Sequence, residues 1–483
     1  MRPSKDPKEL EKMITVATSS QSFDQSLGIP KWFMLDSSLV LGKLVNCTKA
    51  TFHSDAGLEF SISLQCAIPP ASSYVHLDCA QAVTPPTEEH GFYGASSVVA
   101  ADGEVLLVRI VVPVKGKYGY NYPVEYFIYA PCLQTPPIER LPCMDDEWAR
   151  WPGVLGIAHC GKCVMVVGFR KILVVDNTCK GARKELVQLG RFCSGAKNWD
   201  VEEIELPYDH DNGLEPFQWD TAFAFSYGNR MSFVDYNTGL MFCDIFSDSP
   251  NLQYVKFPVP VRKVNFSVED NDQEEGVPIE SYRNVGICEG KIKFVSVDSC
   301  CNKTTGPIIK TWTLCIPGMV WEKDSILDVK HLWATAFKAS RLPLWVPRFP
   351  VVDAQDPDIL HFVLLGPNYH DRVWIVTIDM KTATLKSYKN YRNAEQRDEY
   401  KGIFMYKPFL CSVLSKYTVG PSDWQVDENR AMMWRAAAME ETDSEHEDAS
   451  CRSMEMYYSD DEDRMTDDED RRRVVEYDNV FME

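Results

Sequence analysis

The chain has 483 residues, of which 45% are hydrophobic and 12% aromatic, with ordinary numbers of Gly (26) and Pro (29). This composition excludes a collagen-like, low-complexity or wholly disordered protein. The formal net charge is −20, but residues 440–483 hold 18 acidic residues and five Arg, so the remainder carries only −7. Most of the charge imbalance therefore belongs to the C-terminal segment.

The polar leader, residues 1–29, carries Asp6, Glu9 and Glu11 and has no apolar centre, so it resembles neither a secretory signal nor a transit peptide. The longest apolar run, LLVRIVVPV, is interrupted by Arg109 and is too short to span a membrane. We expect a cytoplasmic or nuclear protein whose 16 cysteines stay reduced. Because no basic stripe is present, we expect neither a nucleic acid nor a membrane as a direct partner.

Residues 30–420 form a large body that is rich in short strand signals. The clearest is the alternation of Phe217, Trp219, Thr221, Phe223, Phe225 and Tyr227, which places these side chains on one face of a predicted strand. Further predicted strands cover residues 106–112, 124–130, 164–169, 171–176, 292–297, 310–315 and 373–378. Long helical periodicity is almost absent before residue 420.

A weak internal repeat runs through this body. A hydrophobic strand ends in Asp, turns through small polar residues and returns as a second strand, at Asp176, Asp235, Asp379 and, less clearly, Asp298. Asp suits such positions because its carboxylate accepts hydrogen bonds from the backbone amides of the turn. A unit of about 60 residues with four strands predicts six or seven units.

The predicted fold class is all-β. Many antiparallel strands must hide their edges, and radial repetition achieves this, so the best interpretation is a β-propeller-like domain over residues 30–420. Two packed β-domains are the alternative.

The pattern changes near residue 421. Ser422 and Gln425 form a capping box, and the Ala- and Met-rich run that follows, with Ala431, Trp434 and Ala438 in one stripe, predicts a helix over residues 421–441. Residues 442–483 are too acidic to bury apolar surface, which predicts a disordered tail.

The segment GIAHCGKC (156–163) is a near match to a phosphate-binding loop. Cys163 stands where Ser or Thr would bind Mg²⁺, and the following VMVVGF predicts a strand instead of a helix, so a hairpin turn at Gly161 and Lys162 is the better interpretation. Cys160 and Cys163 also form a CxxC motif preceded by His159, but no second pair of ligands completes a zinc site. We interpret them as ordinary reduced cysteines.

Neither a Gly-x-Ser-x-Gly nor a His-Glu-x-x-His motif occurs, and the nine His residues lack metal-binding spacing. We therefore predict no catalytic, cofactor-binding or metal-ligating residue, no cofactor, and a protein that is not an enzyme. The tail provides the most specific functional signal: Ser444, Ser459 and Thr466 each have an acidic residue three positions downstream, which suits kinases with a basic substrate groove. A tail that is never modified is the alternative.

Several motifs occur in an order that resembles the grass-expanded plant family catalogued as domain of unknown function 1618. They span roughly residues 30–390, and the most specific is GLMFCDIFSDSPNLQYVKFPVP (239–260), accompanied by PKWFMLD, IPPASSYVHLDC, EYFIYA, TWTL, MVWEKD and LPLWVPRFPVVDAQDPDIL. The resemblance implies a plant source and a propeller-like fold related to F-box-associated and kelch modules. It implies no activity, cofactor or catalytic residue. The acidic tail lies outside it.

Together these features predict a non-catalytic platform for protein–protein interaction in a plant cell, with unknown protein partners and a tail that tunes partner choice. One alternative is an enzyme with an unrecognised site in the propeller channel. Another is a substrate-recruiting subunit that works with a ubiquitin ligase, although 29 residues before the body are too few for an F-box.

Overall fold

The computed structural model describes thirteen stretches of the chain, which contain all the elements discussed here. They are residues 32–80, 96–112, 114, 122–131, 138–143, 153–160, 163–176, 182–207, 219–261, 278–298, 306–366, 372–391 and 409–413. The predicted leader, helix 421–441 and acidic tail, with the candidate phosphorylation sites Ser444, Ser459 and Thr466, lie outside the described residues. The domain boundaries given for them remain predictions.

Six four-stranded sheets follow one another along the chain, and we number them as blades 1 to 6. Blade 1 contains β2 (Val40–Leu41), β3 (Ala50–His53), β4 (Glu59–Gln65) and β5 (Tyr74–Cys79). Blade 2 contains β6 (Ser97–Asp102), β7 (Val105–Val111), β8 (Val124–Tyr129) and β9 (Ile138–Arg140). Blade 3 contains β10 (Val154–Cys160), β11 (Cys163–Asp176), β12 (Ala182–Cys193) and β13 (Asp200–Glu205).

The second half of the described chain repeats the same plan. Blade 4 contains β14 (Phe223–Tyr227), β15 (Arg230–Asp235), β16 (Gly239–Asp244) and β17 (Leu252–Lys256). The short 3₁₀ helix η5 (Ile279–Ser281) leads into blade 5, which contains β18 (Arg283–Cys288), β19 (Lys291–Asp298), β20 (Ile308–Cys315) and β21 (Val320–Asp328). Blade 6 contains β22 (Pro347–Val352), β23 (Ile359–Leu364), β24 (Trp374–Asp379) and β25 (Thr384–Asn390).

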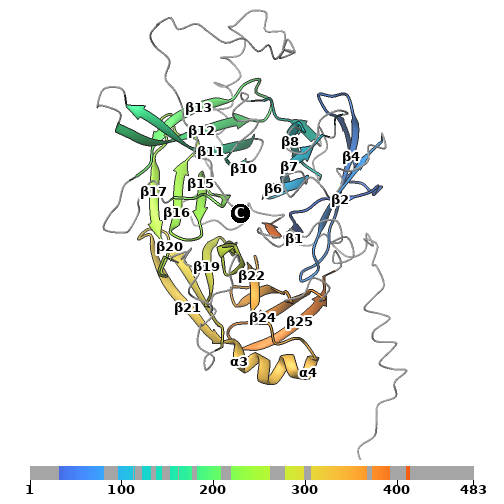
Figure 1. Cartoon of the computed structure of the whole chain (residues 1–483), viewed down its shortest axis with the longest axis vertical. Helices are drawn as coiled ribbons and strands as arrows, with labels where there is room; N and C mark the ends of the chain where they lie inside the picture. Colours follow the sequence, from blue (N-terminus) through green and yellow to red (C-terminus); the bar gives the residue numbers. More distant parts are fainter. Residues whose placement is uncertain are drawn as a thin grey trace, which may run out of the picture.

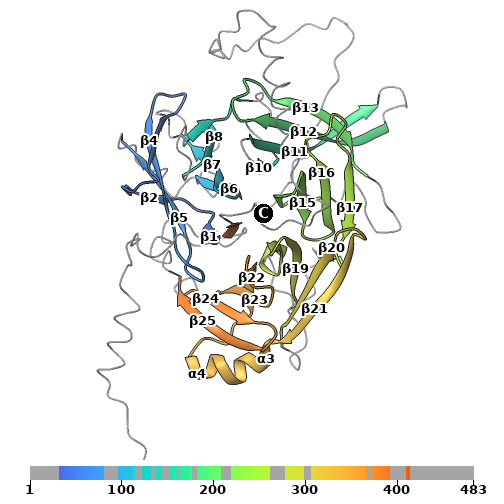
Figure 2. The ribbon, with the colours of Figure 1, turned by 180° about the vertical axis from the view of Figure 1, so that it is seen from behind.

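The blades surround a common centre (Figures 1 and 2). In blades 2 to 6 the strands pair in chain order as antiparallel neighbours, and the first strand of each blade is the innermost. Blade 1 has the order β2-β5-β4-β3, with β2 parallel to β5. The predicted all-β, propeller-like fold is confirmed, and the described residues form six blades.

Six hydrophobic clusters formed by the described residues hold the ring together, one between each pair of neighbouring blades. The cluster between blades 3 and 4, for example, includes Phe169, Phe233 and Met241. The other clusters join blades 1 and 2, 2 and 3, 4 and 5, and 5 and 6, and the last joins β1 to blade 6. Because burial of apolar surface is the main stabilising term, each blade depends on both its neighbours.

The ring closes through the two ends of the described chain. Strand β1 (Trp32–Asp36) pairs antiparallel with β26 (Phe409–Val413), and both are packed at the inner end of blade 1. The buried Asp36 carboxylate accepts a hydrogen bond from the buried Tyr391 hydroxyl, which comes from the end of blade 6. It also accepts one from the Ser38 backbone N–H at 2.9 Å.

The Tyr391→Phe variant tests this closing contact. Removing one donor to a buried carboxylate should cost about 1–3 kcal/mol of unfolding free energy, because the carboxylate is not resolvated. Tyr388→Phe is the matched control, since Tyr388 is 45% exposed and its change should stay within about 0.5 kcal/mol. Denaturant unfolding of both variants measures the difference, and equal stabilities would contradict the proposed closing role.

Several predicted strands differ from the observed ones. The alternating strand from Phe217 to Tyr227 is wrong in its extent: β14 begins at Phe223, and its last four residues are all buried. The innermost strand of a blade faces a neighbouring blade on both sides, so it is buried on both faces instead of alternating. Residues 164–169 and 171–176 form one continuous strand, β11, which runs through the buried Arg170.

A helical segment that the sequence did not predict connects blades 5 and 6. It comprises α3 (Val329–Leu332), the π-helical turn η6 (Trp333–Phe337) and α4 (Lys338–Ser340). Asp328 caps its start by accepting a hydrogen bond from the Lys330 backbone N–H at 2.9 Å. Its apolar side chains join the cluster between blades 5 and 6, so the segment covers the outside of blade 6 beside β25.

Candidate functional site

Three inner strands meet at a buried carboxylate near the centre of the ring. Asp102, the last residue of β6, accepts hydrogen bonds from the His159 backbone N–H at 2.8 Å and from the Ser226 hydroxyl at 2.5 Å. Asp102 and Ser226 are both 4% exposed. This contact joins blades 2, 3 and 4 near the centre, and no sequence pattern predicted it.

Asp, His and Ser are the residue types of a hydrolase triad, but their arrangement here is different. In a triad the imidazole lies between the carboxylate and the hydroxyl and accepts the proton of the hydroxyl. Here the Ser226 hydroxyl donates directly to the Asp102 carboxylate, and His159 contributes its backbone N–H. The geometry favours a structural tie between the inner strands.

A second polar network lies in blade 6. The His361 ring is within 3.0 Å of the Thr377 hydroxyl through Nδ1 and within 3.2 Å of the Asp353 carboxylate through Nε2. Burial raises the pKa of Asp353, but hydrogen bonds from His361 and from the backbone N–H groups of Gln355 and Asp356 outweigh it, so the pKa lies below its usual value. Thr377 is only 5% exposed, and its hydroxyl is within hydrogen-bond distance of His361 of the neighbouring strand. The network around His361 therefore has a structural role as well.

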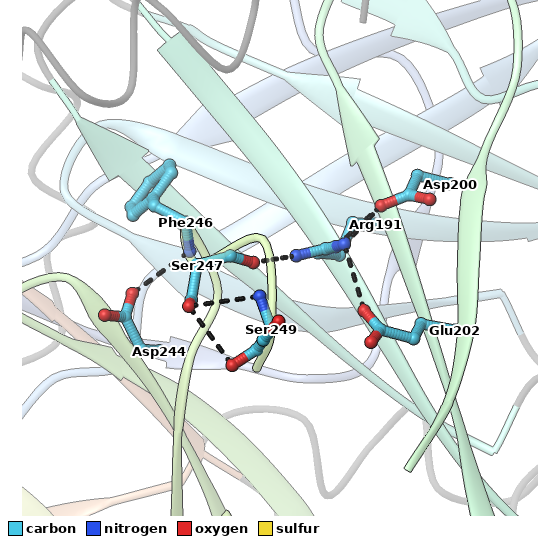
Figure 3. A network of polar contacts seen from close by, with 7 residues as sticks. All are labelled: Arg191, Asp200, Glu202, Asp244, Phe246, Ser247 and Ser249. Atoms are coloured by element: carbon cyan, nitrogen blue, oxygen red, sulfur yellow. Dashed lines mark hydrogen bonds and ion pairs between the residues drawn. The ribbon is translucent and has the colours of Figure 1, made fainter. Parts of the chain in front are cut away.

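Figure 3 shows a third network, which joins blade 3 to blade 4. The buried Arg191 guanidinium binds Asp200 of β13 at 2.5 Å and Glu202 at 3.4 Å, and donates to the Ser247 backbone carbonyl at 2.7 Å. The loop containing Ser247 is shaped by Asp244, which accepts from the Phe246 backbone N–H. This loop belongs to the FCDIFSDSP motif quoted above, so the motif has a structural role in anchoring blade 4 to blade 3.

The turn aspartates lie at strand ends, as predicted. Asp176, Asp235 and Asp298 end the second strands of blades 3, 4 and 5. Asp379 is an exception to the repeat, because it ends the third strand of blade 6 and so lies on the opposite face of the ring. Asp235 accepts from the Asn237 backbone N–H at 2.8 Å, and Asp379 from the Thr382 backbone N–H at 2.9 Å. These two carboxylates serve their own turns, as the sequence predicts.

The two cysteines of the CxxC motif lie on neighbouring strands of blade 3. Cys160 and Cys163 are opposite each other in the strand register at the end of the β10–β11 hairpin, so the predicted hairpin is confirmed. Burial raises the pKa of Cys243 and of Cys288 to about 12, which keeps both thiols protonated. Among the described side chains, no three His, Cys, Asp or Glu residues form a group suited to a metal ion.

Glu125 of β8 is a buried carboxyl at the contact between blades 1 and 2. Its Oε1 accepts from the Asp55 backbone N–H at 3.0 Å, and its Oε2 lies 3.8 Å from the Arg140 guanidinium. The side chain is 9% exposed, and burial raises its pKa to about 7. The fold therefore favours the protonated form of Glu125 at pH values where an unfolded Glu is ionised.

The Glu125→Gln variant should reveal this titration. The stabilising effect of the raised pKa is complete below about pH 4.5 and is lost as the pH rises through about 7. Glu125→Gln cannot ionise. The difference in unfolding free energy between this variant and the natural protein should therefore shift in favour of the variant by about 1–3 kcal/mol as the pH rises from 5 to 8. Unfolding free energies at both pH values measure this, with exposed Glu59→Gln as control. An equal difference at the two pH values would contradict the prediction.

Two outer surfaces carry opposite charge. The acidic outer strand is β13, the edge of blade 3, with Asp200, Glu202, Glu203 and Glu205 and no basic residue. The basic outer surface of blade 6 consists of the helical segment 329–341 and β25, which pack against each other and contain no acidic residue. Its Lys, Arg and His residues are Lys330, His331, Lys338, Arg341, Lys386 and Lys389. These surfaces are the strongest candidates for contact with other macromolecules.

None of the helical segments in the described stretches has the length and apolar character of a bilayer-crossing helix.

Comparison with known proteins gives weak structural similarities. No curated protein matches the sequence of the chain. Prolyl oligopeptidase B from Galerina marginata is 10% identical with a TM-score of 0.30, over 71% of this chain and 43% of that one. A putative 6-phosphogluconolactonase from Bacteroides fragilis is 11% identical with a TM-score of 0.31, over 76% and 97%. The Bombyx mori GH32 β-fructofuranosidase is 8% identical with a TM-score of 0.25, over 61% and 58%.

The sequence family gives a more direct result. A family described as protein of unknown function (DUF1618) matches residues 233–361. This segment runs from β15 of blade 4 through the whole of blade 5 to β23 of blade 6, and it includes the loop that Arg191 anchors. The resemblance based on sequence motifs is confirmed there, because residues 233–361 match the family described as protein of unknown function (DUF1618).

Proposed function

We propose that this protein is a non-catalytic scaffold that binds other proteins, acting in the cytoplasm or nucleus of a plant cell. The observation that carries the proposal is the separation of charge on a rigid ring: acidic β13 lies on the rim of blade 3, and the basic outer surface on the rim of blade 6. Complementary surface charge steers association and selects partners.

The use of the buried polar groups supports a scaffold. Asp102, His361 and Arg191 each join neighbouring strands or blades through the hydrogen bonds described above. An enzyme needs a titratable group that a substrate can approach, and these groups are directed to the fold itself. The outer strands, in contrast, present charged side chains to solvent.

Affinity capture from a plant extract tests the proposal with three forms of bait. The full-length chain should enrich a specific set of proteins, and the variant Glu203→Lys with Glu205→Lys should lose part of that set. A chain ending at residue 439 should show a changed set, because the acidic tail tunes partner choice. Each enriched protein is then purified and its direct binding measured. Identical lists without specific enrichment from all three baits would contradict the scaffold function.

The second candidate is an enzyme with a site near the centre of the ring, favoured by one observation. Asp102 and Ser226 place a buried carboxylate and a hydroxyl in contact where the inner strands converge. A screen for turnover of small esters, amides and glycosides, repeated with Asp102→Asn and with Ser226→Ala, distinguishes the two candidates. Turnover that both variants abolish without unfolding would favour the enzyme over the scaffold.

A further inference from the structure

The turn between β3 and β4 of blade 1 rests on blade 2 through a buried carboxyl group. Glu125 Oε1 accepts a hydrogen bond from the Asp55 backbone N–H at 3.0 Å. Glu125 Oε2 is buried and has no hydrogen-bond partner among the described residues. The Arg140 guanidinium lies 3.8 Å from it, beyond hydrogen-bond distance. One oxygen of the carboxyl group is therefore neither hydrated nor hydrogen-bonded.

Apolar side chains surround this carboxyl group. Phe127 lies two residues after Glu125, on the same face of β8, and its ring centre is 4.4 Å from that of Phe52 of β3. Leu58, at the end of the turn, and Ile138 of β9 pack on the same cluster. An ionised carboxylate is costly in such surroundings, and burial raises the pKa of Glu125 to about 7.

Two charged groups lie beside Glu125, one from each blade. Asp55 in the turn and Arg140 of β9 form an ion pair, with side chains that are 73% and 40% exposed. Because β3 and β9 are the outer strands of blades 1 and 2, this pair lies at the outer edge of the ring. Water therefore reaches the ion pair, whereas Glu125 Oε2 is buried.

The other titratable side chains of the strands around Glu125 have different surroundings. Tyr129 lies on the same face of β8, but its hydroxyl donates to the Thr48 backbone carbonyl at 2.6 Å. Glu139 of β9 faces blade 3, where it accepts hydrogen bonds from residues 194 and 195. The titratable side chains of β3, β4, β7, β8 and β9 that alternate with residues of this interface, and so lie on the opposite faces of their strands, are His53, Glu59, Arg109, Tyr126 and Glu139.

The turn of residues 54–58 holds itself together. The Ser54 backbone N–H donates to the Leu58 carbonyl at 3.0 Å, and the Leu58 backbone N–H donates to the Ser54 hydroxyl at 3.1 Å. The Gly57 backbone N–H donates to the Ser54 carbonyl at 2.9 Å. Because these hydrogen bonds lie within the turn, the turn can lift from blade 2 and keep its own shape. Lifting breaks the hydrogen bond of Asp55 to Glu125.

Ionisation of Glu125 changes the balance between a closed and a lifted turn. In the closed arrangement the carboxylate keeps one backbone donor and lacks water at its second oxygen. In the lifted arrangement water reaches both oxygens. The interactions lost are one hydrogen bond and an exposed ion pair, and both are individually weak. Hydration of a charged carboxylate therefore favours lifting, whereas a neutral carboxyl favours the closed turn.

We propose that Glu125 is the proton-sensitive part of a latch between blades 1 and 2: the turn 54–58 is closed on blade 2 while this carboxyl is neutral and lifts when it is ionised. Lifting exposes Glu125 and separates Asp55 from Arg140, so the outer edge between the two blades gains free acidic groups. The latch acts within one chain and does not depend on the scaffold function proposed above.

The direction of the pH dependence follows from linkage. In the lifted turn Glu125 returns to its ordinary pKa of 4.5, and in the closed turn its pKa is about 7. Protons therefore favour the closed arrangement, fully below about pH 4.5 and progressively less as the pH rises through about 7. Between pH 5 and pH 8 the opening equilibrium of the turn should rise at least about fivefold.

Amide hydrogen exchange of the full-length chain, measured by NMR between pH 5 and pH 8, tests the latch. The Asp55 amide donates to Glu125, so we expect its protection factor, corrected for the intrinsic exchange rate at each pH, to fall at least about fivefold with a midpoint near pH 7. The Ser54 amide should keep its protection, because its partner Leu58 moves with it. The 13C shift of the Glu125 carboxyl should titrate with the same midpoint.

Two variants identify the titrating group. Glu125→Gln keeps an oxygen acceptor for the Asp55 amide but cannot ionise, so the protection of this amide should no longer depend on pH. Glu59→Gln, an exposed position at the start of β4, should keep the fall in protection. Thermal unfolding checks that both variants are folded, and if Glu125→Gln is not, the agreement of the two midpoints in the natural protein decides.

Four results would overturn the proposal. They are a Glu125 carboxyl that titrates near pH 4.5, an Asp55 amide equally protected at pH 5 and pH 8, a fall in protection that persists in Glu125→Gln, and an equal loss at the Ser54 amide. The last result would mean that the turn unfolds instead of lifting as a unit.

Discussion

Leu410→Ala should lower the free energy of unfolding by about 2–4 kcal/mol, although Leu410 lies in a strand of only five residues. Leu410 is 4% exposed, pairs with Leu35 of β1 and belongs to the cluster between blades 1 and 2. Truncation removes buried methyl groups and leaves a cavity that a ring of packed sheets cannot easily fill.

The size of the effect follows from the position of β26 in the ring. This strand contacts β22 of blade 6 and pairs with β1 at the inner end of blade 1, so it connects the last blade to the first. Leu344→Ala is the matched control, because Leu344 is 57% exposed and its truncation should change stability by less than about 0.5 kcal/mol. Denaturant unfolding compares the variants. A loss no larger than that of the control would show that the ring is stable without this closing strand.

Much of this architecture could be predicted from local sequence patterns. Runs such as 106–112 and 124–130 correspond to β7 and β8 with shifts of one residue at their ends. The turn aspartates Asp235 and Asp298 mark successive blades, because each chain unit repeats one supersecondary structure. These patterns depend only on residues that are close together in the sequence, so they can be recognised without knowing how the blades pack.

The closing contact could not be predicted, because its partners are far apart in the sequence. Trp32 pairs with Val413, and Asp36 binds Tyr391 across 355 residues. No pattern within β1 or β26 specifies the other strand. The helical segment, in contrast, did leave a signal that was missed: Asp328 is an N-cap, and the buried Val329 and Leu332 follow it three residues apart, as on one face of a helix.

The two charged surfaces also differ in whether they could be predicted from the sequence. The acidic character of β13 is readable from the run DVEEIE, since every other residue of an edge strand faces solvent. The basic outer surface of blade 6 joins residues 329–341 to 384–390, and only the packing of the helical segment on β25 brings them together. The Asp102 contact with Ser226 depends in the same way on how three blades converge.

Gly239→Ala should cost about 2–4 kcal/mol, because the new methyl group would meet backbone and not only mobile side chains. A Cβ at Gly239 would lie 2.3 Å from the Val255 carbonyl oxygen and 2.8 Å from a ring carbon of Tyr254. To accommodate it, β16 must separate from β17, which breaks their pairing at the start of the segment GLMFCDIFSDSP.

Gly318→Ala provides the control for this substitution. A Cβ at Gly318 would meet only the Val320 side chain, at 3.7 Å, so its stability should change by less than about 0.5 kcal/mol. Because the Arg191 anchor holds the loop after β16, the Gly239→Ala variant should also loosen the contact between blades 3 and 4. Hydrogen exchange of the β16 and β17 amides, measured with the unfolding free energy, detects both effects. If neither variant differed from the natural protein in unfolding free energy, the close approach of β16 and β17 would not exclude a larger residue at position 239.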